Sequence, residues 1–243
     1  MLPVDPNNHA DAQAGVVLPG PDVLPVTPRA TPMFRLLRAT LGPLLRAVFD
    51  WRVSGRENLP AGRPYVIIAN HLNWIDPWAL LLHLPVEPRI HFLANPANLV
   101  RHRLDWWVVR KVGGYIPVDL SHRAGPGLFR QVDLCLERGG VVAIFPEAAY
   151  GPHEGELQPM KRGFAHFAVD NHVSVVPIGL SGTKDLWLRK QIRMQIGKPI
   201  DPDGHDADAL FELATAQLRG LVPPYSEPPG PKLLRRFLTR LLY

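Results

Sequence analysis

The segment Tyr65-Val66-Ile67-Ile68-Ala69-Asn70-His71-Leu72-Asn73-Trp74-Ile75-Asp76-Pro77 decides the predicted fold of this chain. Its first five residues are apolar and rich in β-branched side chains, which is typical of a buried strand. The residues that follow, Trp78-Ala79-Leu80-Leu81-Leu82-His83, predict a helix with Pro77 at its first position and Asp76 as its N-cap. A strand followed so closely by a helix is the unit from which α/β folds are built.

His71 and Asp76 are the candidate catalytic residues of this segment. His71 lies where the strand ends and Asp76 where the helix begins, so the carboxylate can hold one imidazole nitrogen and leave the other free to accept a proton. The alternative is an aspartate that only caps the helix and a histidine in a solvated loop. The spacing alone favours that alternative, whereas the setting between a strand and a helix favours catalysis.

Strands and helices alternate along the rest of the chain, and the strands are continuously apolar. Such strands are typical of sheets that are covered on both faces. The sequence therefore predicts an α/β fold with a mixed, largely parallel sheet, helices on both faces and amphipathic helices at the termini. The expected strands are a short one beginning at Val53 and runs at 65–69, 89–94, 115–118, 141–145, 173–180 and 192–196; the expected internal helices span 97–112, 127–138, 160–170 and 206–221.

Four regions are predicted from composition. Residues 1–31 carry six prolines and read as a disordered tail, and residues 32–51 form an amphipathic N-terminal helix segment that Gly42-Pro43 should kink or split. Residues 52–222 form the main domain. Residues 223–243 are a proline-rich linker and a basic amphipathic helix.

The two terminal helices have two interpretations. Each either packs on protein or lies on an anionic membrane surface with its arginines at the headgroups. For the C-terminal helix, the protein surface would be the N-terminal helix or a second subunit. For the N-terminal helix the sequence leaves the two interpretations even. The C-terminal helix separates its apolar from its basic and polar residues completely, which favours the membrane.

Charge and cysteine content restrict the partners and metals that this protein is expected to bind. The net charge of +5 and pI near 9.6 suit an anionic surface or substrate. The basic residues of the terminal helices accompany leucines rather than exposed aromatic residues, so no nucleic-acid partner is predicted. The single cysteine, Cys135, is expected in the core, and His71 and Asp76 have no evident third ligand, so no metal is predicted. No apolar run is long enough to span a bilayer and no signal peptide is evident, so we expect a cytoplasmic, peripherally membrane-associated protein.

Over about residues 52–200 the chain resembles the glycerolipid acyltransferase family typified by the 1-acylglycerol-3-phosphate acyltransferases. Each matching block is short, but four in the family's order and at suitable separations make a specific pattern. The blocks are Asn70-His71 with Asp76, which matches Asn-His-x4-Asp; Gly114-Tyr115-Ile116-Pro117-Val118-Asp119; Phe145-Pro146-Glu147; and Val176-Pro177-Ile178, preceded by Lys161-x-Gly163.

This resemblance implies an acyltransferase domain that moves a fatty acyl group from acyl-CoA or acyl-carrier protein to a hydroxyl of a glycerolipid or lysolipid-like acceptor. His71 would be the general base, oriented by Asp76. A thioester is already activated, so neither a nucleophilic side chain nor a cofactor is implied. The substrate-binding candidates are Gly114, Asp119, Arg123, Glu147, Lys161 and Arg162.

The chain departs from the family at two arginine positions. After Phe145-Pro146-Glu147 the family continues Gly-Thr-Arg-Ser, whereas this chain has Ala148-Ala149-Tyr150-Gly151, and Leu120 stands where an arginine is common. These arginines resemble a grip on an acceptor phosphate. Either the other basic candidates replace them or the acceptor carries no phosphate there. A catalytically inactive lipid-binding protein and a thioester hydrolase remain alternative functions.

Overall fold

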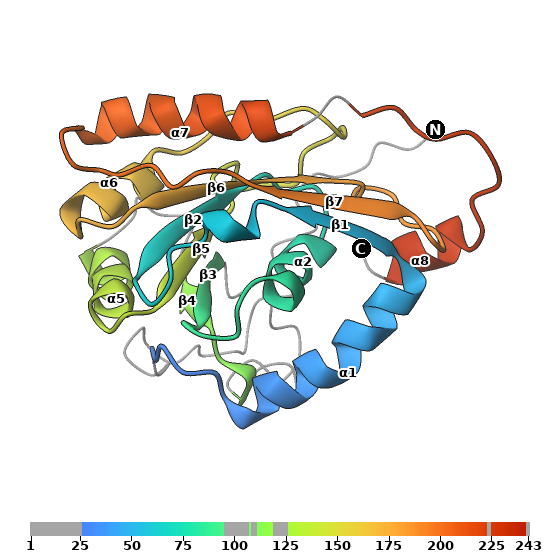
Figure 1. Cartoon of the computed structure of the whole chain (residues 1–243), viewed down its shortest axis with the longest axis horizontal. Helices are drawn as coiled ribbons and strands as arrows, with labels where there is room; N and C mark the ends of the chain where they lie inside the picture. Colours follow the sequence, from blue (N-terminus) through green and yellow to red (C-terminus); the bar gives the residue numbers. More distant parts are fainter. Residues whose placement is uncertain (1–25, 95–106, 108–110, 119–125, 223–224, 242–243) are drawn as a thin grey trace, which may run out of the picture.

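Residues 26–94, 107, 111–118, 126–222 and 225–241 are described by a computed structural model of the protein (Figure 1). Within these ranges the strands join in one sheet in the order β1-β7-β6-β2-β5-β3-β4. β2 pairs in parallel with β5 and β6, whereas β7 runs antiparallel to β6. The predicted mixed, largely parallel sheet is thus confirmed. The strands are β1 (Asp50–Ser54), β2 (Tyr65–Ala69), β3 (Ile90–Ala94), β4 (Tyr115–Pro117), β5 (Val141–Ile144), β6 (Val175–Ser181) and β7 (Gln191–Ile196).

Helices cover both faces of this sheet, as predicted (Figure 1). One face carries α1 (Pro32–Val48) and α2 (Ile75–His83), and the other carries α5 (Pro126–Glu137), α6 (Gly163–Asp170) and α7 (Ala207–Leu221). The central strand β2 is buried along its whole length. Its alternate residues serve opposite cores: Ile67 packs with α2, and Ile68 with α6 and α7. Burial on both faces explains the continuously apolar strands.

The carboxyl ends of the parallel strands point the same way, and the loops at this end of the sheet, called its carboxyl edge, carry the candidate site. His71 follows β2 there, and Glu147 follows β5 there. In parallel sheets the loops at this edge are the usual place for ligands. The chain pairs β2 with β5 through Tyr65–Ile68 and Val141–Ile144, so the two loops emerge side by side.

Two helices differ from prediction. α2 begins at Ile75 rather than Pro77. The Asp76 carboxylate accepts from the amides of the preceding loop, so it does not cap the helix. Pro77 fits inside the first turn, because backbone N–H groups there have no acceptor within the helix. α1 is a single helix across Pro43, not two pieces. Its start is fixed by Thr31, whose hydroxyl accepts from Phe34 N at 3.1 Å, and Phe34 is buried in the core.

The predicted boundaries also shift. Residues 1–25 lie outside the described residues, but the end of the expected disordered tail is packed: Val26 is buried and its carbonyl accepts from Arg138. β1 begins at Asp50, so the main domain includes residues assigned to the N-terminal segment. A short 3-10 turn, Arg56–Asn58, follows it. Most of the helix expected at 97–112 lies outside the described residues.

The C-terminal helix α8 (Arg235–Leu241) docks on the protein beside the end of α1 (Figure 1). Leu238 is buried in a small core with Phe49, Ile75 and Leu186, and Leu45 of α1 packs against this core. Other apolar side chains of the C-terminal segment stay open: Leu233, Leu234 and Phe237 are 61%, 57% and 59% exposed. The terminal helix therefore packs on the protein, which is one of its two predicted positions, and the segment also presents an apolar surface.

Candidate active site

His71 and Asp76 are in direct contact. His71 Nδ1 lies 2.9 Å from Asp76 Oδ2, and the Asp76 side chain is fully buried. The same oxygen accepts from the backbone amides of Leu72 at 2.6 Å and Asn73 at 2.8 Å. Three donors on one oxygen fix the carboxylate in place. The contact inferred from the sequence spacing is therefore present.

The hydrogen-bond pattern assigns the tautomer of His71. An oxygen that accepts from two amides acts as an acceptor toward the imidazole as well, so the Nδ1 proton points at Asp76. Nε2 then carries the free lone pair. This is the arrangement of a general base with an orienting carboxylate.

Two aromatic rings hold the imidazole. The Phe145 ring stacks on it with centroids 4.0 Å apart and planes 14° from parallel, and the Tyr150 ring meets it edge-on at 4.5 Å. The His71 side chain is 16% exposed, so it is sheltered but reachable. Tyr150 occupies the position at which the sequence departs from the arginine of the resembled family, so a phenol ring rather than a cation borders the base.

Glu147 braces the backbone of the histidine. Its Oε1 accepts from His71 N at 2.8 Å and its Oε2 from Gln158 N at 2.7 Å. Burial raises the pKa of this carboxyl, while the two backbone hydrogen bonds oppose the rise. Glu147 therefore bonds two loop amides, and one of them belongs to His71.

Asn70 and Asn73 hold the rest of the loop. The Asn70 side chain donates to Leu180 O at 2.9 Å and accepts from Leu180 N at 2.7 Å, which ties the residue after β2 to β6. Asn73 donates to Lys184 O at 3.1 Å. Both asparagines belong to the segment that decides the predicted fold. Their hydrogen-bond partners lie 110 or more residues away, so the sequence spacing did not predict these contacts.

Gly114 has a structural reason to be glycine. Its φ is +77°, and a Cβ there would lie 2.4 Å from the buried guanidinium of Arg89 and 2.7 Å from Ile90 O. Its carbonyl accepts from Phe92 N. Gly114 therefore shapes the β3–β4 pairing rather than lying beside His71.

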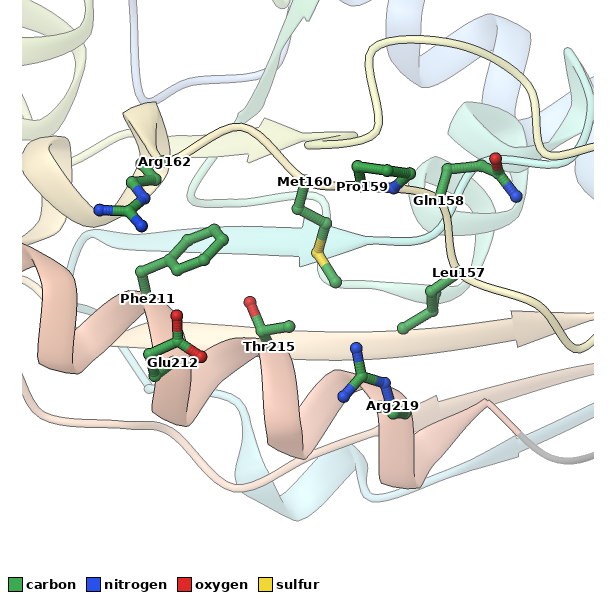
Figure 2. A pocket seen from close by; sticks show the side chains of 9 residues that line it. All are labelled: Leu157, Gln158, Pro159, Met160, Arg162, Phe211, Glu212, Thr215 and Arg219. Carbon is green, nitrogen blue, oxygen red and sulfur yellow. The ribbon is translucent and has the colours of Figure 1, made fainter.

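Of the basic candidates, Arg162 lies on the α7 side of the sheet. Arg162 pairs with Asp208 of α7 and lines a cavity of about 500 Å³ between residues 157–162 and α7 (Figure 2). In that view Met160 points into the cavity from the loop, and Thr215 and Arg219 border it from α7. The α7 face is opposite to the face that holds Asp76. Lys161 is exposed, and its amide donates to Pro146 O. Asp119 and Arg123 lie outside the described residues.

The buried cysteine has no place in this site. Cys135 is fully buried with its sulfur 3.3 Å from His91 Nδ1, and burial raises the pKa of its thiol to about 12. It is a core residue, as predicted.

The part of the chain that carries the sheet and the His71–Asp76 pair matches a known family. The acyltransferase family model matches residues 50–181, which include both members of the His71–Asp76 pair, Glu147 and the strands that carry them. The chain belongs to this family. The predicted family and class of enzyme are therefore confirmed.

Particular relatives refine the placement. The chain is 30% identical over 180 residues to the 1-acyl-sn-glycerol-3-phosphate acyltransferase of Bacillus subtilis, covering 72% of this chain and 84% of that protein. It is 26% identical over 190 residues to the human 1-acyl-sn-glycerol-3-phosphate acyltransferase alpha, of which it spans only 63%. The crystal structure of the 1-acyl-sn-glycerophosphate acyltransferase PlsC from Thermotoga maritima shares the fold, with a TM-score of 0.61, 21% identity and 80% of each chain covered.

Within the described residues, every helix is too short or too polar to cross a bilayer.

Proposed function

We propose that this protein transfers a fatty acyl group from an acyl thioester to a hydroxyl of a glycerolipid or lysolipid-like acceptor. His71 Nε2 takes the hydroxyl proton while the oxygen attacks the thioester carbonyl. The tetrahedral intermediate then expels the thiolate, which receives the proton from the imidazolium. Asp76 holds the tautomer and offsets the transient positive charge. The observation that carries the proposal is the 2.9 Å contact between His71 and Asp76 in a chain of the acyltransferase family.

The relatives support a glycerolipid acceptor, because those compared are named 1-acyl-sn-glycerol-3-phosphate acyltransferases. Arginines commonly bind phosphate groups in pairs of hydrogen bonds. Here Tyr150 borders His71 instead, and Arg162 pairs with Asp208 on the α7 face. We therefore extend the acceptor class to lysolipids whose phosphate is esterified or lies further from the reacting hydroxyl. The donor is acyl-CoA or acyl-carrier protein.

Peripheral binding to an anionic membrane is the second part of the proposal. The apolar side chains that α8 leaves open, Leu233, Leu234 and Phe237, lie at the same edge of the sheet as the β6–β7 loop. Arg236 and Arg240 of the same helix are exposed beside them. An apolar patch with neighbouring cations suits the headgroup region of an anionic bilayer.

The test is a thiol-release assay. Purified protein is incubated with an acyl thioester, with and without lysophosphatidate, glycerol 3-phosphate or lysophospholipids, and the acylated product is identified by mass spectrometry. Acceptor-dependent release supports acyl transfer. Release without acceptor would instead indicate a thioester hydrolase, and no release would indicate a lipid-binding protein.

His71→Ala is the decisive variant. It removes the base and should abolish acceptor-dependent release while circular dichroism shows an intact fold. Full activity in this variant refutes His71 as the base.

A further inference from the structure

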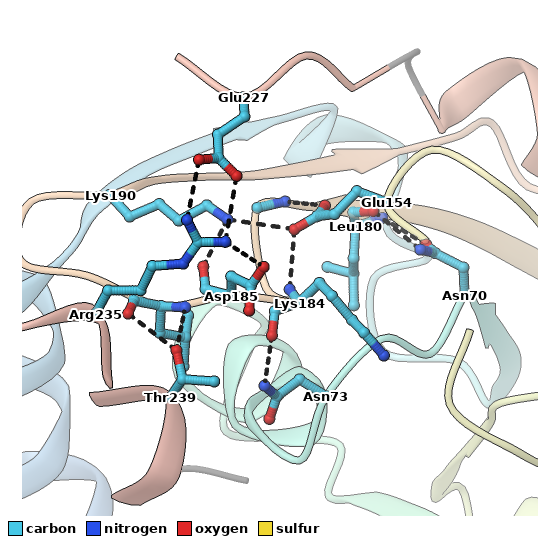
Figure 3. A network of polar contacts seen from close by, with 12 residues as sticks. Asn70, Asn73, Glu154, Leu180, Lys184, Asp185, Lys190, Glu227, Arg235 and Thr239 are labelled. Atoms are coloured by element: carbon cyan, nitrogen blue, oxygen red, sulfur yellow. Dashed lines mark hydrogen bonds and ion pairs between the residues drawn. The ribbon is translucent and has the colours of Figure 1, made fainter. Parts of the chain in front are cut away.

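A buried ion pair lies beside the catalytic loop. Glu154, on the loop after β5, and Lys190, just before β7, have side chains only 6% and 2% exposed, and Lys190 Nζ lies 3.3 Å from Glu154 Oε1 (Figure 3). Lys190 also donates to Asp185 O at 2.6 Å. Replacing such a pair by apolar side chains often leaves stability unchanged or raises it, so stability alone does not explain its presence.

Glu154 folds the loop between β6 and β7 around itself. Its Oε2 accepts from Gly182 N at 2.7 Å and its Oε1 from Lys184 N at 2.9 Å. Together with Lys190, three donors from residues 182–190 converge on one carboxylate. A buried carboxylate with several charge-assisted hydrogen bonds is a strong geometric constraint.

The loop that Glu154 shapes is the loop that holds the catalytic segment. Lys184 O accepts from the buried Asn73 side chain, and Lys184 Nζ donates to Gly151 O at 2.7 Å. Gly151 N in turn donates to His71 O at 2.7 Å. Lys184 is therefore connected to both ends of the turn that carries His71: to Asn73 by one hydrogen bond, and to His71 by two hydrogen bonds through Gly151.

The C-terminal segment closes the same loop from outside. Arg235 pairs with Asp185 at 2.8 Å and with Glu227, and the Thr239 hydroxyl bonds both backbone groups of Leu186 (Figure 3). These outer contacts are more exposed than the Glu154–Lys190 pair. They support the loop, whereas Glu154 defines its shape.

We propose that Glu154 is a positioning residue for the transfer reaction: by fixing the 182–190 loop, it sets the orientation of Asn73 and the backbone of His71, and through them the His71–Asp76 pair. It does not touch the substrates. This inference rests on the proposed function, because it gives Glu154 its role through His71. A small displacement of a base from its productive geometry is enough to slow catalysis strongly.

The test variant is Glu154→Gln. It keeps the side chain's size but replaces an accepting oxygen by an amide donor that faces N–H groups, and it leaves the Lys190 ammonium without its counter-charge. We expect kcat per folded enzyme to fall about 10- to 100-fold while KM for donor and acceptor changes less than about twofold. Hydrogen exchange of the Leu72 and Asn73 amides, which bond Asp76, should become faster than in the wild type.

Glu156→Gln is the matched control, since Glu156 lies two residues away on the same loop with an exposed side chain. It should change neither kcat nor the exchange of these amides. If Glu154→Gln does not fold, Arg235→Gln combined with Thr239→Val removes the outer contacts, and it should lower kcat and speed the same amides to a smaller degree.

Wild-type kcat in the folded Glu154→Gln protein, or unchanged exchange at Leu72 and Asn73, overturns the inference. The same holds for the Arg235→Gln, Thr239→Val protein when it is used instead. Retained activity in His71→Ala would overturn the proposed function instead. An inactive His71→Ala protein beside a fully active Glu154→Gln protein would refute only the role of Glu154.

Discussion

At the scale of single residues, His71 is held by three neighbours. Asp76 binds Nδ1, Phe145 covers the ring, and Glu147 binds the backbone amide of the same residue. Asp76 and Phe145 thus fix the ring of His71, whereas Glu147 fixes its main chain. We expect substitutions of the first two to disturb the imidazole and a substitution of Glu147 to disturb the loop backbone.

Replacing Asp76 with Asn should lower kcat about 10²- to 10⁴-fold. The amide oxygen can still accept from Leu72 N and Asn73 N, so the loop keeps its shape, but the charge that offsets the imidazolium is lost. Steady-state kinetics with the best acceptor measures the effect. Asp203→Asn, at a side chain 81% exposed, is the control and should retain full activity.

We predict that His91 makes the stability of the protein sensitive to acid. Burial, aided by Arg89, lowers the pKa of His91 from 6.5 to about 4. Because the unfolded chain binds the proton first as the pH falls, the stability that this group contributes is complete above pH 6.5 and is lost toward pH 4.

The loss of unfolding free energy from His91 should reach about 3 kcal/mol across that window. Urea denaturation of the wild type and of His91→Gln between pH 7 and 4 measures it. The variant should show a shallower decline, because glutamine has no proton to gain. Parallel curves for the two proteins would contradict this assignment.

At the scale of elements, close packing of α7 on β6 depends on one glycine. A Cβ at Gly179 would lie 2.4 Å from the Leu221 carbonyl oxygen, whereas a Cβ at Gly220, near the end of α7, meets nothing within 4 Å. Both glycines lie near the contact between α7 and β6, but packing requires a glycine only at position 179.

Gly179→Ala should therefore destabilise the protein by about 1–3 kcal/mol. Gly220→Ala should be neutral or stabilising by up to about 1 kcal/mol, because alanine favours the helix. Thermal or urea denaturation of both variants gives the comparison. Equal stability of the two alanine variants would show that α7 moves away from β6 at little cost.

At the scale of the whole molecule, the β6–β7 loop joins the end of the sheet that carries His71 to the open apolar surface of the C-terminal segment. Leu188 N donates to Leu233 O, and Arg235 holds Asp185 of the same loop. A membrane that contacts α8 would thus lie near the loops around His71, where the proposed lipid acceptor would enter.

Changing Leu233, Leu234 and Phe237 together to Ser should weaken binding to anionic vesicles at least about tenfold, because about 1.5–3 kcal/mol is available for each large apolar side chain that becomes fully buried. Sedimentation with phosphatidylglycerol-containing and with phosphatidylcholine vesicles measures it. Thermal stability should stay unchanged, since these side chains are already exposed. Leu238→Ser should instead destabilise the docking of α8, because Leu238 is 7% exposed.

The sequence by itself determined the local features. The apolar run at 65–69, the helix that follows and the contact between His71 and Asp76 depend on residues close along the chain, so periodicity and spacing contain them. The start of α2 was misplaced by two residues because the carboxylate of Asp76 bonds the preceding loop, which a capping pattern does not distinguish from a helix cap.

Only the tertiary structure decided what surrounds that pair. Glu147 reaches His71 across 76 residues, Asn70 reaches Leu180 across 110, and Glu154 reaches Lys190 across 36. The sheet order brings these loops to one edge, and no short-range pattern encodes that order. The placement of Arg162 has the same cause: its partner Asp208 lies 46 residues away on α7, and hydrogen bonds between distant segments, rather than local preference, set the geometry of the site.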